Sequence, residues 1–160
     1  MTDAHSRTDP RANPRADPRA DPRADPRAHL PGPAALPCPC GSGQSYQQCC
    51  AVWHHGAQRL LAPRADLLMR SRYSAFVLDL HDYLLDTWHP NSRPATLEPS
   101  PPGLKWLGLT VKRHIQHDDT HAEVEFVARS RLHGRGQRLH ETSRFVREDG
   151  RWFYVDGDLR

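Results

Sequence analysis

Several features that would assign a protein to a common class are missing from this 160-residue sequence. No stretch reaches the roughly 18 consecutive apolar residues that can span a bilayer, so we expect no membrane segment. The N-terminal residues lack the apolar segment of a secretory signal, which predicts a cytoplasmic protein. Charge is nearly balanced, with 22 basic and 19 acidic side chains, and therefore gives no ground for a nucleic-acid groove from charge alone.

Catalytic signatures are missing as well. The sequence has no Ser-His-Asp nucleophile elbow, no phosphate-binding glycine loop and no His-Glu-x-x-His pair. Histidines flank two predicted turns, but spacings of three and four across a turn hold no fixed ligand geometry. We expect most of these histidines to be solvated: His114, His117, His121, His133 and His140. These absences favour a non-enzymatic protein.

The first 36 residues contain almost no apolar side chain other than alanine. Residues 8–27 repeat an Asp-Pro-Arg-Ala tetrapeptide, with Asn in place of one Asp. Proline removes a backbone donor and disfavours helix in the residue before it, which predicts an extended, disordered tail over residues 1–36. Three interpretations of this tail remain open. It is a solvated segment that arose from an expanded DNA repeat, the result of a start codon assigned too far upstream, or a spacer or weak interaction arm.

All four cysteines lie within thirteen residues, as Cys38-Pro-Cys40, eight residues, then Cys49-Cys50. Zinc prefers four thiolates in a tetrahedron with sulfurs about 4 Å apart, and two close pairs across a glycine turn can supply them. Bridging the neighbours Cys49 and Cys50 would strain the backbone, and a cytoplasmic address disfavours disulfides. We predict one structural zinc on Cys38, Cys40, Cys49 and Cys50. His54 and His55 are alternative ligands, but we expect both to be exposed helix residues.

These residues resemble a known zinc motif. Cys38-Pro-Cys-Gly-Ser-Gly43, Tyr46 and Cys49-Cys50 are similar to the SEC-C motif at the C-terminus of the SecA translocation ATPase. The chain that follows resembles the bacterial YchJ family, whose function is uncharacterised, over residues 37–157. The matching segments are Leu68–Phe76, Asp82–Leu84, Thr87–Pro90, Trp106–Leu109, Phe126–Arg129 and Ser143–Phe145. The resemblance implies a SEC-C zinc module at 37–60 and a nuclear transport factor 2-like domain at 61–160, an α+β cone.

Two departures from the relatives limit what the resemblance implies. Many YchJ relatives carry a second C-terminal cysteine motif, which this chain lacks. In SecA the motif is lysine-rich and binds the SecB chaperone, but Gln44, Gln47 and Gln48 occupy the equivalent positions here. The charged contact is missing, so we do not transfer SecB binding.

The order of elements independently predicts the α+β class. An apolar stripe (Ala65, Leu68, Met69, Ala75, Phe76) predicts a helix after Pro63, and Asp79 with Asp82 predicts a capping box for a second helix, closed by Pro90. Residues 91–103 predict a loop. Alternation then predicts a four-stranded antiparallel meander, whose first strand points Leu107, Leu109, Val111 and Ile115 inward, and Asp149-Gly150 predicts the last hairpin.

Two charged residues fall at apolar positions of this pattern. Arg72 lies on the helix stripe, and Glu141 shares strand parity with Leu139 and Phe145. A buried charge is costly unless paired, so the pattern favours a structural Arg72–Glu141 ion pair or a snorkelling arginine, and the alternative is that both are ligand-binding or catalytic groups in a cavity.

These patterns favour an accessory protein whose zinc module contacts an unknown protein, of a translation- or secretion-associated kind, while the cone holds a small ligand or peptide. Two alternatives remain open. One is a small isomerase- or hydrolase-like enzyme with Glu141 as general base and Arg72 or Tyr73 as electrophilic partner. The other is an RNA-binding zinc knuckle that stacks bases on Tyr46 and Trp53.

Overall fold

The computed structural model describes residues 36–160, so the tail expected at residues 1–36 lies outside the described part except for Leu36. The helical elements come first: α1 (Ala51–His54), a 3-10 turn (Gly56–Gln58), α2 (Ala65–Val77) and α3 (His81–Asp86). The strands follow: β1 (Lys105–Gln116), β2 (His121–Leu132), β3 (Arg135–Glu148) and β4 (Arg151–Leu159). Within residues 36–160, every helix is too short or too polar to cross a membrane.

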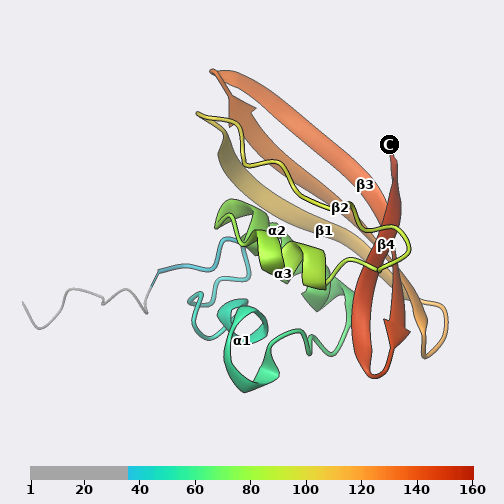
Figure 1. Ribbon diagram of the computed structural model, residues 1–160. Coiled ribbons are helices and arrows are strands. Elements are labelled where there is room, and N and C mark those ends of the chain that lie inside the picture. Colours follow the sequence, from blue (N-terminus) through green and yellow to red (C-terminus); the bar gives the residue numbers. More distant parts are fainter. Residues whose placement is uncertain (1–35) are drawn as a thin grey trace, which may run out of the picture. The chain divides into compact units, whose positions relative to one another are not determined.

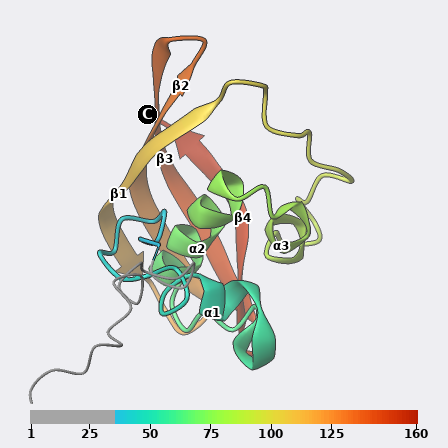
Figure 2. The ribbon, with the colours of Figure 1, turned by 90° about the vertical axis from the view of Figure 1, so that its left-hand side faces the viewer.

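The four strands form one antiparallel sheet in the order β1-β2-β3-β4, and α2 and α3 lie against one face of it (Figure 1). This confirms the α+β meander. Asp149 and Gly150 join β3 to β4 with φ angles of 49° and 78°, the positive pair that a type I′ turn requires. Figure 2 shows that the segment between α3 and β1 passes above α3 and α2, on the side away from α1, before it enters the sheet.

The first strand does not alternate regularly, and part of the predicted inward set is wrong. Register shifts occur between Trp106 and Gly108 and between Val111 and Arg113. Each bulge adds a residue and reverses the side that faces the core. Leu107 is therefore 51% exposed, and Ile115 pairs with Glu123 on the outer face. Trp106 packs against the core instead, together with the correctly predicted Leu109 and Val111.

The capping box predicted for α3 does not form. Leu80 is the N-cap, and no side chain caps the helix. Asp79 has a φ of 53°, and its carboxylate accepts a hydrogen bond from Ser100 Oγ at 2.7 Å, which ties the start of α3 to the loop before β1. The helix also ends at Asp86, four residues before Pro90. A tertiary contact replaces the local cap that the sequence predicted.

Candidate functional site

The cysteine turn is a small closed hairpin. The Cys38 N–H donates to Gln44 O at 2.8 Å, and Pro37 and Ser45 form an antiparallel bridge. Gly41 and Gly43 have φ angles of 74° and 82°, which other residues adopt only with strain. The turn brings Cys38 and Cys40 against Cys49 and Cys50, the residues at the start of α1.

The four thiols make a candidate metal centre. Their sulfur atoms all lie within 4.8 Å of one another, with Cys40 Sγ 3.6 Å from Cys49 Sγ. These separations are close to the roughly 4 Å between ligands in a tetrahedral thiolate site. Contacts from Cys40 and Cys50 lower the pKa of Cys38, whereas contact with Cys38 raises the pKa of Cys50 and burial raises the pKa of Cys49 to about 11. The cluster alone therefore cannot ionise all four thiols, while a bound cation would favour four thiolates.

The module is packed directly on helix α2. Cys38 Sγ lies 3.6 Å from Ser74 Oγ, and Arg70 Nη1 donates to Cys40 O at 3.2 Å. His54 Nε2 lies 2.9 Å from the carbonyl oxygen of Ser71, which can only accept, so Nε2 carries the proton and donates. In the neutral ring Nδ1 then accepts from the Tyr46 hydroxyl at 2.8 Å.

His54 departs from expectation, because it is a buried connector rather than an exposed helix residue. Its side chain is only 2% exposed and packs edge-on against Tyr83 with ring centres 4.5 Å apart. Burial lowers the pKa of His54 to about 4. His55 is exposed, as predicted. The Tyr46 ring packs against the cysteines and the Trp53 ring against the main core, and both stay partly exposed.

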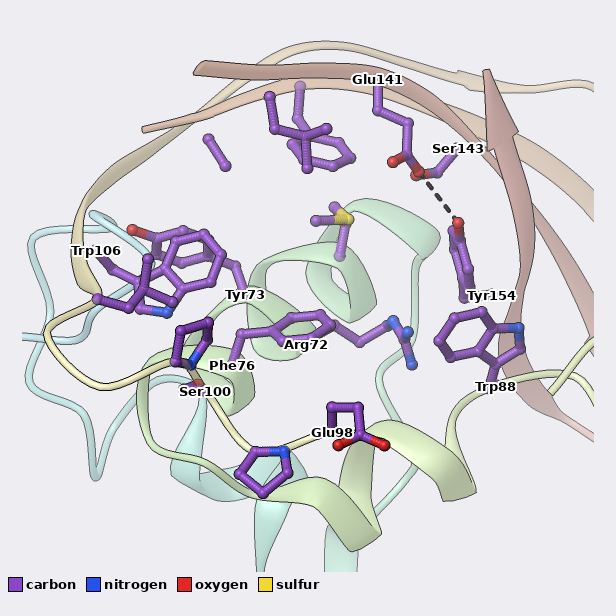
Figure 3. Close-up of a pocket in the computed structure, with 17 residues that line it drawn as sticks. Arg72, Tyr73, Phe76, Trp88, Glu98, Ser100, Trp106, Glu141, Ser143 and Tyr154 are labelled. Atoms are coloured by element: carbon purple, nitrogen blue, oxygen red, sulfur yellow. Dashed lines mark hydrogen bonds between the residues drawn. The ribbon is translucent and has the colours of Figure 1, made fainter. Parts of the chain in front are cut away.

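A cavity of about 490 Å³ opens between the opposite side of α2 and the inner face of the sheet (Figure 3). Aromatic and aliphatic side chains form most of its wall, and the loop before β1 closes one side with Glu98, Pro99, Ser100 and Pro101. The remaining lining residues are Met69, Arg72, Tyr73, Phe76, Trp88, Leu104, Trp106, Phe126, Ala128, Leu139, Glu141, Ser143 and Tyr154. Both charged residues predicted from the sequence therefore line one cavity.

Arg72 is buried at the base of this cavity, with 3% of its surface exposed. Its Nη1 donates to Leu84 O and to Thr87 Oγ1, both at 2.7 Å. Its guanidinium carbon lies 4.7 Å from the centre of the Tyr154 ring and 5.3 Å from that of Trp88. Burial lowers the pKa of Arg72 to about 10, so the group keeps its charge near neutral pH. Its Nε and Nη2 donors have no hydrogen-bond acceptor among residues 36–160.

Glu141 hangs into the cavity from β3 and is not paired with Arg72 in the described part of the chain (Figure 3). Its Oε1 accepts hydrogen bonds from Ser143 Oγ at 2.6 Å and from the Tyr154 hydroxyl at 3.2 Å. Burial and the negative charge of Glu141 raise the pKa of Tyr154, which keeps the phenol protonated. A methyl group on Gly157 would lie 2.6 Å from Glu141 Cδ, so this glycine makes room for the carboxylate.

Several cavity residues escaped sequence reasoning. Tyr154 and Trp88 come from different ends of the fold, and a bridge between their backbones places both rings beside Arg72. Ser143 shares the strand parity of Glu141, a signal that sequence reasoning could have used. The residues of the loop before β1 follow no periodic pattern in the sequence. Only the path of the folded chain brings them to the cavity.

The histidines divide into two groups. His117 and His121 are about half exposed, as expected for solvated residues. His114 and His140 are half-buried, with side chains 21% and 18% exposed, and His140 Nε2 lies 2.8 Å from Glu125 Oε1. The alternation of two strands carries these side chains into packed positions that loop spacing did not reveal.

The sheet, its two helices and the cysteine turn define a nuclear transport factor 2-like domain preceded by a SEC-C motif. The SEC-C motif matches residues 36–51, and the family described as YchJ, middle NTF2-like domain, matches residues 64–157. The chain belongs to the YchJ family, whose curated members carry the name UPF0225 protein. It is 62% identical over 132 residues to one from Bordetella bronchiseptica, covering 82% of this chain and 98% of that one. Another, from Methylibium petroleiphilum, is 60% identical over 126 residues, or 79% and 90% of the two chains.

Two solved structures have the same fold. The solution structure of a SEC-C motif containing protein from Rhodopseudomonas palustris is 32% identical, with a TM-score of 0.66 over 77% of this chain and 98% of that one. The crystal structure of a SEC-C motif containing protein from Psychrobacter arcticus is 30% identical, with a TM-score of 0.66 over 79% and 84% of the two chains. These findings confirm the family and architecture predicted from the motifs.

Proposed function

We propose that the cavity binds a small molecule with an apolar body and a carboxylate or other acceptor group at one end. The observation that carries this is Arg72, a buried guanidinium whose Nε and Nη2 make no hydrogen bond to residues 36–160, beside an otherwise apolar space. The partners of Arg72 within residues 36–160 are neutral, burying its charge without a counter-ion is costly, and an acceptor on a ligand would meet these two donors. The volume of about 490 Å³ falls within the range of small-molecule sites.

Paired aromatic probes test this proposal. The fluorescence of Trp88 and Trp106, both in the cavity wall, should change on adding 2-naphthoate and much less on adding 2-naphthamide. Because a charge-assisted hydrogen bond contributes about 1.5–3 kcal/mol, Arg72→Met should weaken naphthoate binding roughly tenfold to a hundredfold. Arg70→Met changes the neighbouring arginine on the module side of α2 and is the matched control.

A space-filling variant makes the test independent of the buried charge. Leu139 lines the cavity but is 39% exposed, so Leu139→Trp should occupy the space without disturbing the core. Unchanged naphthoate binding in this variant would place the probe elsewhere and refute the cavity as its site. A response to naphthamide equal to that of naphthoate would refute the role assigned to Arg72.

A second candidate function, proton abstraction by Glu141, is supported by one observation. The Glu141 carboxylate faces the cavity, unpaired with Arg72, and Oε1 accepts both of its hydrogen bonds from residues 36–160. Oε2 has no protein donor within residues 36–160 and could accept a proton. The probe is 5-nitrobenzisoxazole, whose ring opens when a general base removes its C3 proton. Glu141→Gln should abolish any turnover above buffer while retaining naphthoate binding, whereas equal rates in both proteins would exclude this role.

For the module, we propose one structural zinc held by Cys38, Cys40, Cys49 and Cys50. Four thiolates leave no open position on zinc, so the metal stabilises the turn rather than reacting. Reduced thiols of this kind suit the cytoplasm. Elemental analysis of the purified full chain, with thiol counting before and after denaturation, should give one zinc per chain and four masked thiols. A metal-free protein with four reactive thiols would refute this.

We further propose that the module contacts a protein partner. Gln44, Gln47 and Gln48 are exposed on its surface, so this contact would use amide hydrogen bonds rather than charge. Replacing the three glutamines by glutamate in the full chain should abolish co-purification of the partner while zinc content stays at one per chain. A partner retained by this variant and lost with Leu139→Trp would assign the contact to the cone instead.

A further inference from the structure

The outer face of the sheet, which α2 and α3 leave uncovered, carries charge in an uneven way. Toward the β3–β4 hairpin, opposite charges face each other across the strands. Arg113 is paired in register with Glu125, Glu123 with Arg144, and Arg144 with Asp156. Arg144 also contacts Asp158, 2.6 Å away. In this half of the face, the charged side chains are therefore paired with opposite charges.

The half toward the β2–β3 hairpin has the opposite arrangement. Lys105 lies directly opposite Arg131, and Arg129 lies directly opposite Arg138. Arg129 and Arg131 share one face of β2 because they are two residues apart. We call these four exposed residues the cationic quartet. None of them forms an ion pair in the described part of the chain, and the nearest carboxylate on that face, Glu125, is engaged by His140 and Arg113.

Stability alone does not favour this arrangement. Like charges directly opposite each other on neighbouring strands destabilise a sheet, and here two such pairs are adjacent. Each of these two cross-strand rows also contains a glycine. Gly136 is paired in register with Arg131, and Gly108 with Arg129. A side chain at Gly136 would meet open space, so packing does not require the glycine there. The two cross-strand rows are therefore basic, and opposite Arg131 no side chain of β3 hinders the approach of another backbone.

We infer that the cationic quartet is a docking surface for the phosphate backbone of double-helical RNA. Three of the four cations are arginines, whose planar forks match phosphate oxygens. The quartet contains no aromatic side chain on which single-stranded bases could stack, and no aromatic anchor of the kind that dominates protein interfaces. The quartet spans three strands, whereas the major groove of B-DNA admits a helix or a two-stranded ribbon, so it fits better across the wide, shallow minor groove of A-form RNA.

The salt dependence of binding measures the number of phosphates contacted. The full chain should bind a labelled RNA duplex of about 20 base pairs, with a slope of roughly −3.5 for log affinity against log salt, as expected for about four contacts. The double variant Arg129→Gln/Arg138→Gln should lower this slope to about half and weaken binding at least tenfold at low salt. Because the variant removes a like-charge pair, it should fold at least as stably as the original chain.

The matched control is Lys112→Gln/Arg147→Gln, which removes the same charge from two exposed residues outside the quartet. It should leave the slope within about half a unit of the original value. An equal loss in the control would show that only net charge matters and overturn the proposal. So would equal affinity for a DNA duplex of the same sequence, or preferential binding to polyglutamate or to phosphatidylserine vesicles.

Discussion

The cysteine module and the cone domain lie against opposite sides of the same helix, yet they are held together by different forces. Residues 70, 71 and 74 of α2 face the module, whereas residues 69, 72, 73 and 76 face the cavity. The buried core of the module consists of Cys38, Cys40 and Cys50, and within residues 36–160 the hydrophobic side chains packed against it are Tyr46 and Cys49. The core of the cone is a continuous set of apolar side chains from both helices and three strands. The module therefore has a small core of cysteines, whereas the cone is held together by apolar burial.

Removing one thiol should separate the two regions most strongly. Cys40→Ser should release the metal and unfold residues 38–60 while the sheet persists, because a structural zinc site contributes on the order of 10 kcal/mol to local folding. Metal content, limited proteolysis and far-ultraviolet circular dichroism of the full chain measure the three parts of this outcome. A segment that resists protease as well as the original chain would show that packing on α2 alone holds the module.

Acid should weaken the contact between module and cone. The pKa of His54 falls from its ordinary 6.5 to about 4 in the folded protein, so the unfolded chain binds more protons between these values. Stability is therefore lost as pH falls from about 6.5 through about 4, by up to about 3 kcal/mol. Urea unfolding across this range should show a shallower pH slope in His54→Gln than in the original chain. The exposed neighbour gives the control, and a slope flattened equally by His55→Gln would contradict this assignment.

The cavity side of the comparison can be tested at Gly157. Gly157→Ala should displace the Glu141 carboxylate, and because the clash is with the end of a flexible side chain that faces the cavity, it should destabilise the cone by only about 1 kcal/mol, without affecting metal content. Gly136→Ala, on the neighbouring strand with open space around it, should be neutral or slightly stabilising. Chemical denaturation of the two variants gives the difference. Adding Glu141→Ala to Gly157→Ala should recover stability, and a failure to do so would mean that the clash is not with Glu141.

The smallest expected effect concerns the outer face of the sheet, where stability depends on pairs of surface charges. Arg129→Gln should raise the stability of the cone by up to about 1 kcal/mol, because it removes repulsion from Arg138. Arg144→Gln on the same face should lower stability instead, since it breaks contacts with Asp156 and Asp158. Paired thermal melts measure both signs, and a stability loss in Arg129→Gln would remove the argument that the quartet is electrostatically unfavourable.

Sequence reasoning succeeded where an interaction is local. The four cysteines are close along the chain, so their spacing predicted the cluster. It failed where a distant contact or an inserted residue intervened. Two bulges reversed Leu107 and Ile115, Ser100 replaced the cap expected of Asp79, and a contact with Ser71 buried His54.

The sequence by itself determined the cysteine turn, the family, the Asp149-Gly150 hairpin and the inward positions of Arg72 and Glu141, because these depend on short spacings and on the periods of helix and strand. Only the tertiary structure determined which contacts these side chains make. It separated Arg72 from Glu141, gave each its own partners, and left an apolar cavity between them. It also placed four cations on one half of the outer face of the sheet, in a chain whose overall charge is nearly balanced. Strand register and crossing chain segments bring such residues together, and neither is encoded in the spacing of residues along the chain.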